Sequence, residues 1–188
     1  MTLDIYLSRH GATEWSRNGR HTGITDLELL PEGEEEALRL LPRLRAAGVR
    51  SAFTSDRSRA RRSAALAGFP AAITTPLLRE FDYGEYEGLT TQQIQTTRPD
   101  WEIYHDGCPG GESPDQVYTR AKAALQLAAG APAPVVLFSH GHFLRALAVA
   151  WTDLHIQAAA RLALDTGTLC LLRDGDHGRV LQTWNVPD

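Results

Sequence analysis

Two apolar runs, far apart in the sequence, each lead into a histidine that is followed by glycine; a loop is expected after the first and a helical pattern follows the second. The first run covers residues 3–7 and leads into Arg9-His10-Gly11. The second covers residues 135–138 and leads into Ser139-His140-Gly141. A third run, residues 51–54, also precedes a helical segment. Short apolar runs that alternate with helices are typical of buried parallel strands. The alternation predicts an α/β fold, a three-layer sandwich in which a mostly parallel central sheet has helices on both faces.

The ends of these three runs carry arginine and histidine side chains. His10 and His140 follow the first and second runs within three residues, and Arg59 follows the third by a few residues. Because parallel sheets bind ligands at the carboxyl ends of their strands, we expect the three side chains to converge if the strands are neighbours. Imidazole and guanidinium groups beside helix N-termini suit a compact, multiply charged anion. Phosphate is the predicted ligand.

Composition indicates one ordinary globular domain. The chain has 188 residues, of which 43% are hydrophobic and 22% charged, and no linker or repeat divides it, so we expect a single domain over residues 1–188. Cys108 and Cys170 are the two cysteines, and we expect both to be unpaired structural thiols in a cytoplasmic protein. The sequence contains no apolar run long enough to span a membrane. A net charge of −4 argues against general nucleic-acid binding.

The remaining elements follow from helix and strand signals. The segment 77–113 has weak periodicity and many Gly, Glu and aromatic residues, which predicts an insertion of short helices that caps the substrate pocket at the edge of the sheet. We further expect a helix that begins at the acidic segment 31–36, is kinked by Pro42 and ends at Gly48. Further expected elements are helices at 55–67, 114–129, 146–151 and 158–164, and a terminal hairpin of 169–172 with 180–184.

Four ordered motifs give a resemblance to a known family. Arg9-His10-Gly11, Ser55 with Arg59-Ala60, Leu78-Arg79-Glu80 and Ser139-His140-Gly141 resemble, in order and approximate spacing, the motifs of the histidine phosphatase superfamily. The likeness runs from Leu3 to about Trp184 and implies a phosphoglycerate mutase-like fold. Longer runs, such as residues 82–88 and 106–113, are similar to the branch that contains bacterial acid phosphatases and the fungal sedoheptulose-1,7-bisphosphatase.

The resemblance implies a role for each residue of these motifs. His10 is the expected nucleophile, and a neutral imidazole can attack phosphorus and form a phosphohistidine. Arg9 and Arg59 are expected to clamp the phosphoryl oxygens bidentately, and His140 to donate to the same oxygens. Glu80 is the expected proton donor, a role that needs a sheltered carboxyl group with a raised pKa.

Further acids and polar residues near the motifs are weaker candidates. Asp82, Glu85 and Glu87 compete with Glu80 for the proton-donor role. Ser16 stands where the mutases usually carry asparagine, and Arg57 faces either solvent or the remote end of the substrate. His142 and Arg145 are expected near the entrance. The expected substrate and phosphate-binding positions are Ser16, Thr22, Gly23, Gly141 and His142.

Several residues have plain structural interpretations. His155 and His177 are expected at the surface, whereas His21 and His105 lie where they could touch substrate. Arg61 and Arg62 are expected on a solvated helix face. Trp101 and Tyr104 are expected to pack the insertion against the sheet.

The predicted function is hydrolysis of small phosphorylated metabolites, sugar phosphates or bisphosphates, by a histidine phosphatase without metal or cofactor. The alternative within the superfamily is a cofactor-dependent phosphoglycerate mutase, which needs a closed, water-poor pocket. A metal-dependent hydrolase is disfavoured because no HxxxH or HExxH spacing occurs. The sequence also leaves open a catalytically silent phosphate-binding module and, more remotely, a nucleic-acid-binding protein. The expected partner is a small phosphate ester, with no nucleic acid and no membrane; a homodimer stays open.

Overall fold

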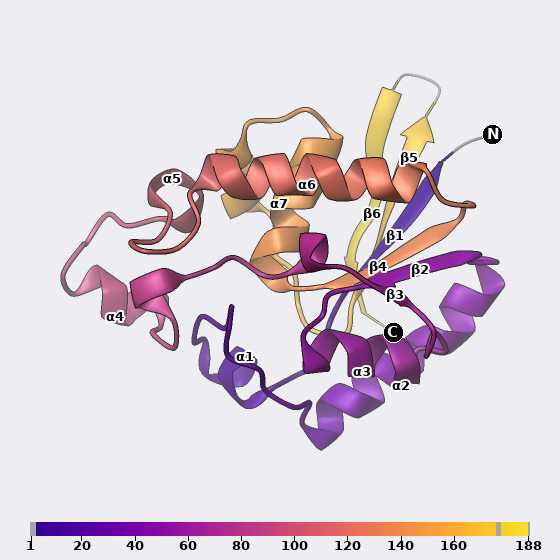
Figure 1. Cartoon of the computed structure of the whole chain (residues 1–188), viewed down its shortest axis with the longest axis horizontal. Coiled ribbons are helices and arrows are strands. Elements are labelled where there is room, and N and C mark those ends of the chain that lie inside the picture. The colour runs from indigo at the N-terminus through magenta and orange to yellow at the C-terminus, as the bar shows by residue number, and fades with distance from the viewer. Residues whose placement is uncertain (1–2, 176–177, 188) are drawn as a thin grey trace.

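The central sheet has six strands in the part of the chain that the computed structural model describes, residues 3–175 and 178–187 (Figure 1). The strands are β1 (Asp4–Arg9), β2 (Ser51–Thr54), β3 (Ile73–Thr74), β4 (Val135–Ser139), β5 (Leu169–Gly175) and β6 (Gly178–Val186). Their order is β3-β2-β4-β1-β5-β6. The pairs among β3, β2, β4 and β1 are parallel, while β5 and β6 are antiparallel to their neighbours. The predicted, mostly parallel sheet is thus confirmed.

The register between β1 and β4 brings the two histidine motifs together. Arg9 lies opposite Ser139, so the chain leaves both strands at the same level of the sheet. The amide of His10 donates to the carbonyl of Ser139 at 3.0 Å, which extends the pairing by one residue. Residues separated by about 130 positions in the sequence, His10 and His140, are therefore neighbours at the carboxyl edge of the sheet.

Helices cover both faces of the sheet, as Figure 1 shows. Side chains along β4 point alternately to the two faces of the sheet. Val135 and Leu137 belong to the core beneath α6 and α7. Val136 and Phe138 belong to the core beneath α2 and α3. The strand is buried on both faces, so its apolar side chains alternate between two cores. The longer helices are α2 (Pro31–Ala46), α3 (Ser58–Leu66), α6 (Pro114–Ala129) and α7 (Gly141–Trp151), and α1 (Glu14–Asn18) is short.

The segment 77–113 consists of short helices joined by loops. They are η1 (Pro76–Leu78), η2 (Gly84–Tyr86), α4 (Thr91–Gln95) and α5 (Ile103–Asp106). Trp101 and Tyr104 are buried in the larger core and fix this segment to the rest of the molecule, as predicted. The Trp101 indole N–H donates to the carbonyl of Gly107, and the Tyr104 hydroxyl donates to the carbonyl of His142.

Some sequence-based boundaries differ from the structure. The helix expected at 158–164 is a 3-10 helix, η3 (Ile156–Arg161), and the helix expected from residue 55 begins only at Ser58. The edge strand β3 and the short helix α1 have no counterpart among the expected elements, because two and five residues give too little periodicity to recognise. Pro42 lies inside α2, which continues to Ala46. The predicted hairpin is present as β5 and β6, although its tip, Asp176 and His177, lies outside the described residues.

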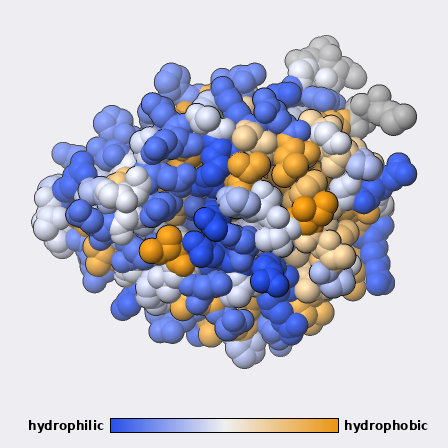
Figure 2. Space-filling view, in the orientation of Figure 1, coloured by the Kyte–Doolittle hydropathy of each residue, from blue (hydrophilic) through white to orange (hydrophobic). Residues whose placement is uncertain are grey.

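The surface mixes polar and apolar side chains. Figure 2 shows a largely hydrophilic face, with apolar residues gathered on the right-hand side of the view. Cys108 and Cys170 are free and buried, as expected. None of the described helices has both the length and the apolar character that a membrane crossing requires.

Candidate active site

The loop that follows β1 is held by close backbone packing. A Cβ atom added to Gly11 would lie 2.0 Å from the carbonyl oxygen of Gly33, so glycine at both positions allows the first turn of α2 to touch the loop. The amide of Gly11 donates to Ser63 Oγ at 3.0 Å, and the amide of Ala12 donates to Glu36 Oε2 at 2.9 Å. The loop that carries His10 is therefore fixed by both α2 and α3.

His10 is oriented as a nucleophile. Its Nδ1 lies 2.8 Å from the carbonyl oxygen of Gly11. A carbonyl oxygen can only accept, so Nδ1 carries the proton and Nε2 keeps its lone pair. Burial, with the charges of Arg59 and Arg9, holds the pKa of His10 well below its usual range. The imidazole is therefore neutral at physiological pH, with Nε2 available for attack.

Arg9 lies on the floor of the cavity beside the nucleophile. Its Nη1 donates to the carbonyl of Leu164 at 2.6 Å, and its buried Nε has no hydrogen-bond partner among the described residues. A Cβ atom at Gly141 would lie 3.2 Å from both Cζ and Nε of Arg9. Glycine at this position lets the guanidinium lie against the start of α7, and the unpartnered Nε is a donor that an anion could use.

Arg59 is fully buried and donates hydrogen bonds to one imidazole and two backbone carbonyl groups. Its Nε donates to Nδ1 of His140 at 3.2 Å, and its Nη atoms donate to the carbonyls of Thr22 at 2.8 Å and Thr25 at 3.0 Å. Its Nη1 also lies 3.8 Å from Oδ1 of Asp26, and Arg59 itself is not among the residues that line the cavity described below.

His140 is packed behind His10. The two ring centroids are 5.2 Å apart in an edge-to-face arrangement. Because Nδ1 of His140 accepts from Arg59, its Nε2 carries the proton and donates to Ser55 Oγ at 2.9 Å. Burial, then the charge of Arg59, holds the pKa of His140 well below its usual range. Both nitrogens thus have protein partners, and the ring supports Arg59 and His10 from below the cavity floor.

Glu80 is placed at the N-terminus of α7. Its Oε1 accepts from the amide of Phe143 at 2.7 Å and from that of Phe81 at 3.0 Å, while Oε2 accepts from the amide of His142 at 3.0 Å. The side chain is buried and also borders the cavity. These contacts hold the carboxyl group in one orientation.

The three acids that compete with Glu80 lie elsewhere. Glu87 accepts hydrogen bonds from the amides of Gly23 and Thr25, and Asp82 Oδ1 accepts from the amide of Gly84. Glu85 is exposed. Of the four acids, Glu80 is the one that lines the cavity.

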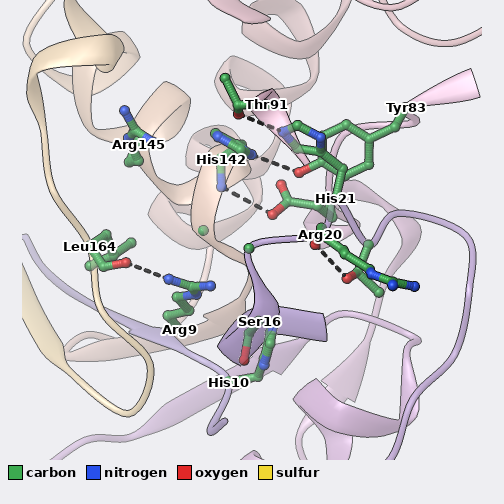
Figure 3. Close-up of a pocket in the computed structure, with 14 residues that line it drawn as sticks. Arg9, His10, Ser16, Arg20, His21, Tyr83, Thr91, His142, Arg145 and Leu164 are labelled. Atoms are coloured by element: carbon green, nitrogen blue, oxygen red, sulfur yellow. Dashed lines mark hydrogen bonds between the residues drawn. The ribbon is translucent and has the colours of Figure 1, made fainter. Parts of the chain in front are cut away.

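A cavity of about 170 Å³ lies above these groups (Figure 3). The residues that line it are Arg9, His10, Ser16, Gly19, Arg20, His21, Thr22, Glu80, Tyr83, Thr91, Gly141, His142, Arg145 and Leu164.

The predicted phosphate-binding positions fall into two groups. Thr22, Gly141 and His142 line the cavity, as does Ser16, whose hydroxyl group is engaged in a capping box with Thr13 at the start of α1. Gly23 does not line it, and its amide donates to the carboxylate of Glu87. This geometry therefore does not support the role expected of Gly23. The direction of a backbone amide cannot be predicted from sequence alone.

The structure also shows where the other predicted histidines and arginines lie. His21 lines the cavity, whereas His105 is exposed and contacts Asp106. His155 is exposed and lies next to Gln157, as expected, and His177 is outside the described residues. The remaining three are arginines: Arg61 and Arg62 are exposed as predicted, and Arg57 lines a separate cavity with Arg79.

One wall of the cavity is built from aromatic and imidazole rings. The Tyr83 hydroxyl lies 2.7 Å from Nδ1 of His142, and the rings of His21 and Tyr83 are 4.7 Å apart. Burial holds the pKa of His142 well below its usual range and raises the pKa of Tyr83 well above its own. This wall is therefore neutral.

Five residues without an expected role in binding complete the cavity: Gly19, Arg20, Tyr83, Thr91 and Leu164. Tyr83 belongs to the run 82–88, which carries part of the family resemblance, and its position three residues after Glu80 is a signal that could have found it. The other four carry no such signal, because tertiary packing alone brings them to the site. Among the described residues, no cluster of three or more His, Cys, Asp or Glu side chains is suited to a metal ion.

Comparison with known proteins gives the family of this α/β protein. The sequence profile of the histidine phosphatase superfamily (branch 1) matches residues 5–187. The acid phosphatase of Mycobacterium tuberculosis is 42% identical over 170 residues, covering 88% of this chain and 83% of that protein. The chain therefore belongs to the histidine phosphatase superfamily, and it is a phosphatase of that family.

Further relatives carry different activities in their names. The sedoheptulose 1,7-bisphosphatase of Saccharomyces cerevisiae is 35% identical over 190 residues, covering 84% of this chain and 70% of that protein. A probable phosphoglycerate mutase of Cronobacter sakazakii is 33% identical over 179 residues, covering 86% of this chain and 80% of that protein. The solved structure of an open-reading-frame product from Mycobacterium tuberculosis superimposes with a TM-score of 0.94 at 38% identity and covers 98% of both chains.

Proposed function

We propose that this phosphatase hydrolyses small phosphorylated metabolites, sugar phosphates in particular, through a phosphohistidine at Nε2 of His10. The observation that carries the proposal is the state of His10: a neutral ring whose proton is held on Nδ1 by the carbonyl of Gly11, so that Nε2 is free. A cavity of about 170 Å³ suits a small ester. The acid phosphatase and the sugar bisphosphatase among the relatives favour the same class of substrate.

The first step transfers the phosphoryl group to the protein. The lone pair of His10 Nε2 forms a bond to phosphorus, the bond from phosphorus to the ester oxygen breaks, and its electron pair stays on that oxygen. Glu80, in its acid form, donates a proton to the departing oxygen. Arg9, which lines the cavity, offsets the charge on the phosphoryl oxygens, and Arg59, held behind the cavity by His140, contributes its positive charge from there.

The second step releases phosphate. Water attacks phosphorus, Glu80 takes the proton of that water, and the bond from phosphorus to Nε2 breaks to restore neutral His10. Glu80 regains from water the proton that it gave to the departing oxygen, so the protein returns to its starting state. The segment 77–113 supplies Glu80, Tyr83 and Thr91 to the cavity, and in this proposal it forms the cap that selects the substrate.

The second candidate is a phosphoglycerate mutase, which the relatives with that name favour. A mutase would keep the phosphohistidine until a bound sugar acid takes the phosphoryl group back. With phosphoglycerate and catalytic bisphosphoglycerate, a phosphatase releases inorganic phosphate. Isomerisation without phosphate release would refute hydrolysis as the activity.

The nucleophile is tested by trapping. Phosphohistidine is lost in acid, so the protein is quenched in alkaline detergent after mixing with a ³²P-labelled ester. We expect label on the unmodified protein and on the control His155→Ala, whose side chain is exposed. His10→Ala should carry no label and lose at least about a thousandfold in kcat/KM. Turnover by His10→Ala at the rate of the control would overturn the proposal.

A further inference from the structure

The backbone around Glu80 is held by a side chain from α6. This backbone follows the 3-10 helix η1, and the last carbonyl groups of a helix have no partner within it. Arg120 supplies donors to them. Its Nη1 donates to the carbonyls of Leu77 at 3.2 Å and Arg79 at 2.6 Å. Its Nη2 donates to the carbonyl of Glu80 itself at 3.2 Å. One guanidinium group therefore fixes the chain up to and including Glu80.

Glu112 extends this contact to the other side of Glu80. Its Oε1 accepts from Nε of Arg120 at 2.9 Å and its Oε2 from Nη2 at 2.7 Å, a bidentate ion pair that we call the Arg120–Glu112 fork. Oε2 also accepts from the amide of Asp82 at 3.0 Å, and the amide of Glu112 donates to the carbonyl of Asp82 at 2.9 Å. The fork is thus bonded to the backbone both before and after Glu80.

The geometry of α6 explains how Arg120 reaches this position. Arg120 lies two turns after the N-cap Ser113, on the same side of the helix. Long side chains in a helix point back toward its N-terminus, which directs the guanidinium group at Glu112 and at η1, which α6 contacts. All five N–H bonds of the guanidinium group have acceptors. The side chains of the pair are only 15% and 22% exposed, so solvent screens their attraction little.

Arg120 also touches a residue that orients the carboxyl group of Glu80. Its guanidinium carbon lies 4.4 Å from the centroid of the Phe143 ring. The amide of Phe143 donates to Glu80 at 2.7 Å, the shortest of the three amide hydrogen bonds to that carboxyl group. Arg120 therefore contacts both the backbone that carries Glu80 and the residue whose amide holds the carboxyl end of its side chain.

The fork lies behind the catalytic cavity, because neither Arg120 nor Glu112 lines it. We propose that the Arg120–Glu112 fork is a positioning pair that holds the Glu80 carboxyl group within reach of the departing ester oxygen. This inference rests on the proposed function, in which Glu80 is the proton donor. A displacement of about 1 Å in such a group lowers the rate by about a hundredfold. The loop of His10 is held by α2 and α3, so loss of the fork affects proton donation and not the position of the nucleophile.

The test compares phenyl phosphate with 4-nitrophenyl phosphate, two esters of similar shape. The weakly basic 4-nitrophenolate leaves without a proton, whereas phenolate needs one. The kcat/KM for phenyl phosphate divided by that for 4-nitrophenyl phosphate, the leaving-group ratio, therefore measures proton donation. Glu80→Gln should lower this ratio by about a hundredfold, since general acid catalysis contributes at least that factor. Arg120→Gln keeps the acid but releases it, and should lower the ratio by about tenfold.

Arg173→Gln is the matched control. Arg173 forms a fork of the same kind between β5 and β1, in which its Nε donates to Oδ1 of Asp4 at 2.7 Å and its Nη2 to Oδ2 at 2.6 Å. It does not line the cavity, so the leaving-group ratio should stay that of the unmodified protein. Arg120→Lys keeps a charge beside Glu112 without the fork and should give an intermediate ratio; it takes the place of Arg120→Gln if that variant does not fold. A loss of folded protein lowers both rates equally and cancels in the ratio.

The outcomes separate the inference from the proposed function. A lower ratio in Arg120→Gln and Glu80→Gln, with none in Arg173→Gln, supports the positioning pair. A lower ratio in Glu80→Gln alone would overturn the inference and leave the proposed function standing, and an equal fall in Arg173→Gln would overturn it as a general effect. An unchanged ratio in Glu80→Gln would instead refute the proton-donor role of Glu80 in the proposed function, and the inference with it.

Discussion

Replacement of Gly11 by alanine tests how strictly the position of His10 depends on backbone packing. A Cβ atom at Gly11 would lie 2.0 Å from the oxygen, 2.6 Å from the carbonyl carbon and 2.8 Å from the Cα of Gly33. In return, a Cβ atom at Gly33 would lie 2.3 Å from the oxygen of Ala12. All of these are backbone atoms, so no side chain can rotate away. The loop and the first turn of α2 must separate by at least about 1 Å to regain ordinary contact.

The size of the effect follows from that separation. Overpacking of this kind costs about 1–3 kcal/mol of unfolding free energy. A shift of about 1 Å in a catalytic group lowers the rate by about a hundredfold. The amides of Gly11 and Ala12 are bonded to Ser63 and Glu36, so the loop cannot move without breaking these bonds or carrying His10 with it. We therefore expect Gly11→Ala to lose about a hundredfold in kcat/KM and to unfold at a lower temperature.

The assay compares kcat/KM for an aryl phosphate with the thermal midpoint of unfolding. Gly130→Ala is the matched control, since a Cβ atom there meets nothing closer than 3.6 Å and its backbone has φ −81°. This control should be as active as the unmodified protein and equally or slightly more stable. If Gly11→Ala matched Gly130→Ala in both measurements, the argument from close backbone packing would be refuted.

Three further predictions concern pH, a loop and metals. The buried histidines with depressed pKa take up protons only on unfolding, so stability is fully present above about pH 6.5 and is lost as pH falls, by up to about 1.4 kcal/mol per pH unit for each histidine. They are His10, His21, His140 and His142. Urea unfolding between about pH 5 and 8 measures the slope, which His142→Asn should reduce by about one proton; an unchanged slope would contradict the assignment. Glu87→Gln weakens the bonds to two amides of the 22–25 loop that supports Arg59 and should lower kcat/KM by about tenfold, whereas the exposed Glu85→Gln should not. Exhaustive chelation should leave phosphate release unchanged, and activity restored only by an added metal would disprove metal-independent hydrolysis.

The parallel part of the fold was predictable because its signals are local. Residues 135–138 are apolar throughout, and such a run followed by a helical pattern is typical of a strand buried on both faces. The ends of β1 and β4 then place His10 and His140 on one edge without any knowledge of the loops. Weak signals explain the errors: the 158–164 segment is apolar enough for a helix but too short to choose between α and 3-10 geometry.

In the candidate site, the approximate position of a residue was easier to predict than the direction in which its side chain or amide points. Glu80 could be placed near the phosphate pocket, but its three amide donors come from α7 and from the residue that follows it, which no spacing reveals. Gly23 is an expected binding position, but its amide donates to Glu87 and the residue does not line the cavity. Arg20 reaches the cavity through the pairing of its backbone with Thr90, a contact between distant loops. Such contacts arise only when the tertiary structure has formed.

The strand order has a consequence for synthesis of the protein. β1 leaves the ribosome before both of its partners, β4 and β5, which come much later in the sequence. β1, an apolar strand in the middle of the sheet, therefore stays unpaired until β4 and β5 have been made. Pairings of such long sequence separation form slowly, and the waiting strand can associate with other nascent chains. Phosphatase activity should accordingly appear only after β5 has been made, because β1 then has both of its partners.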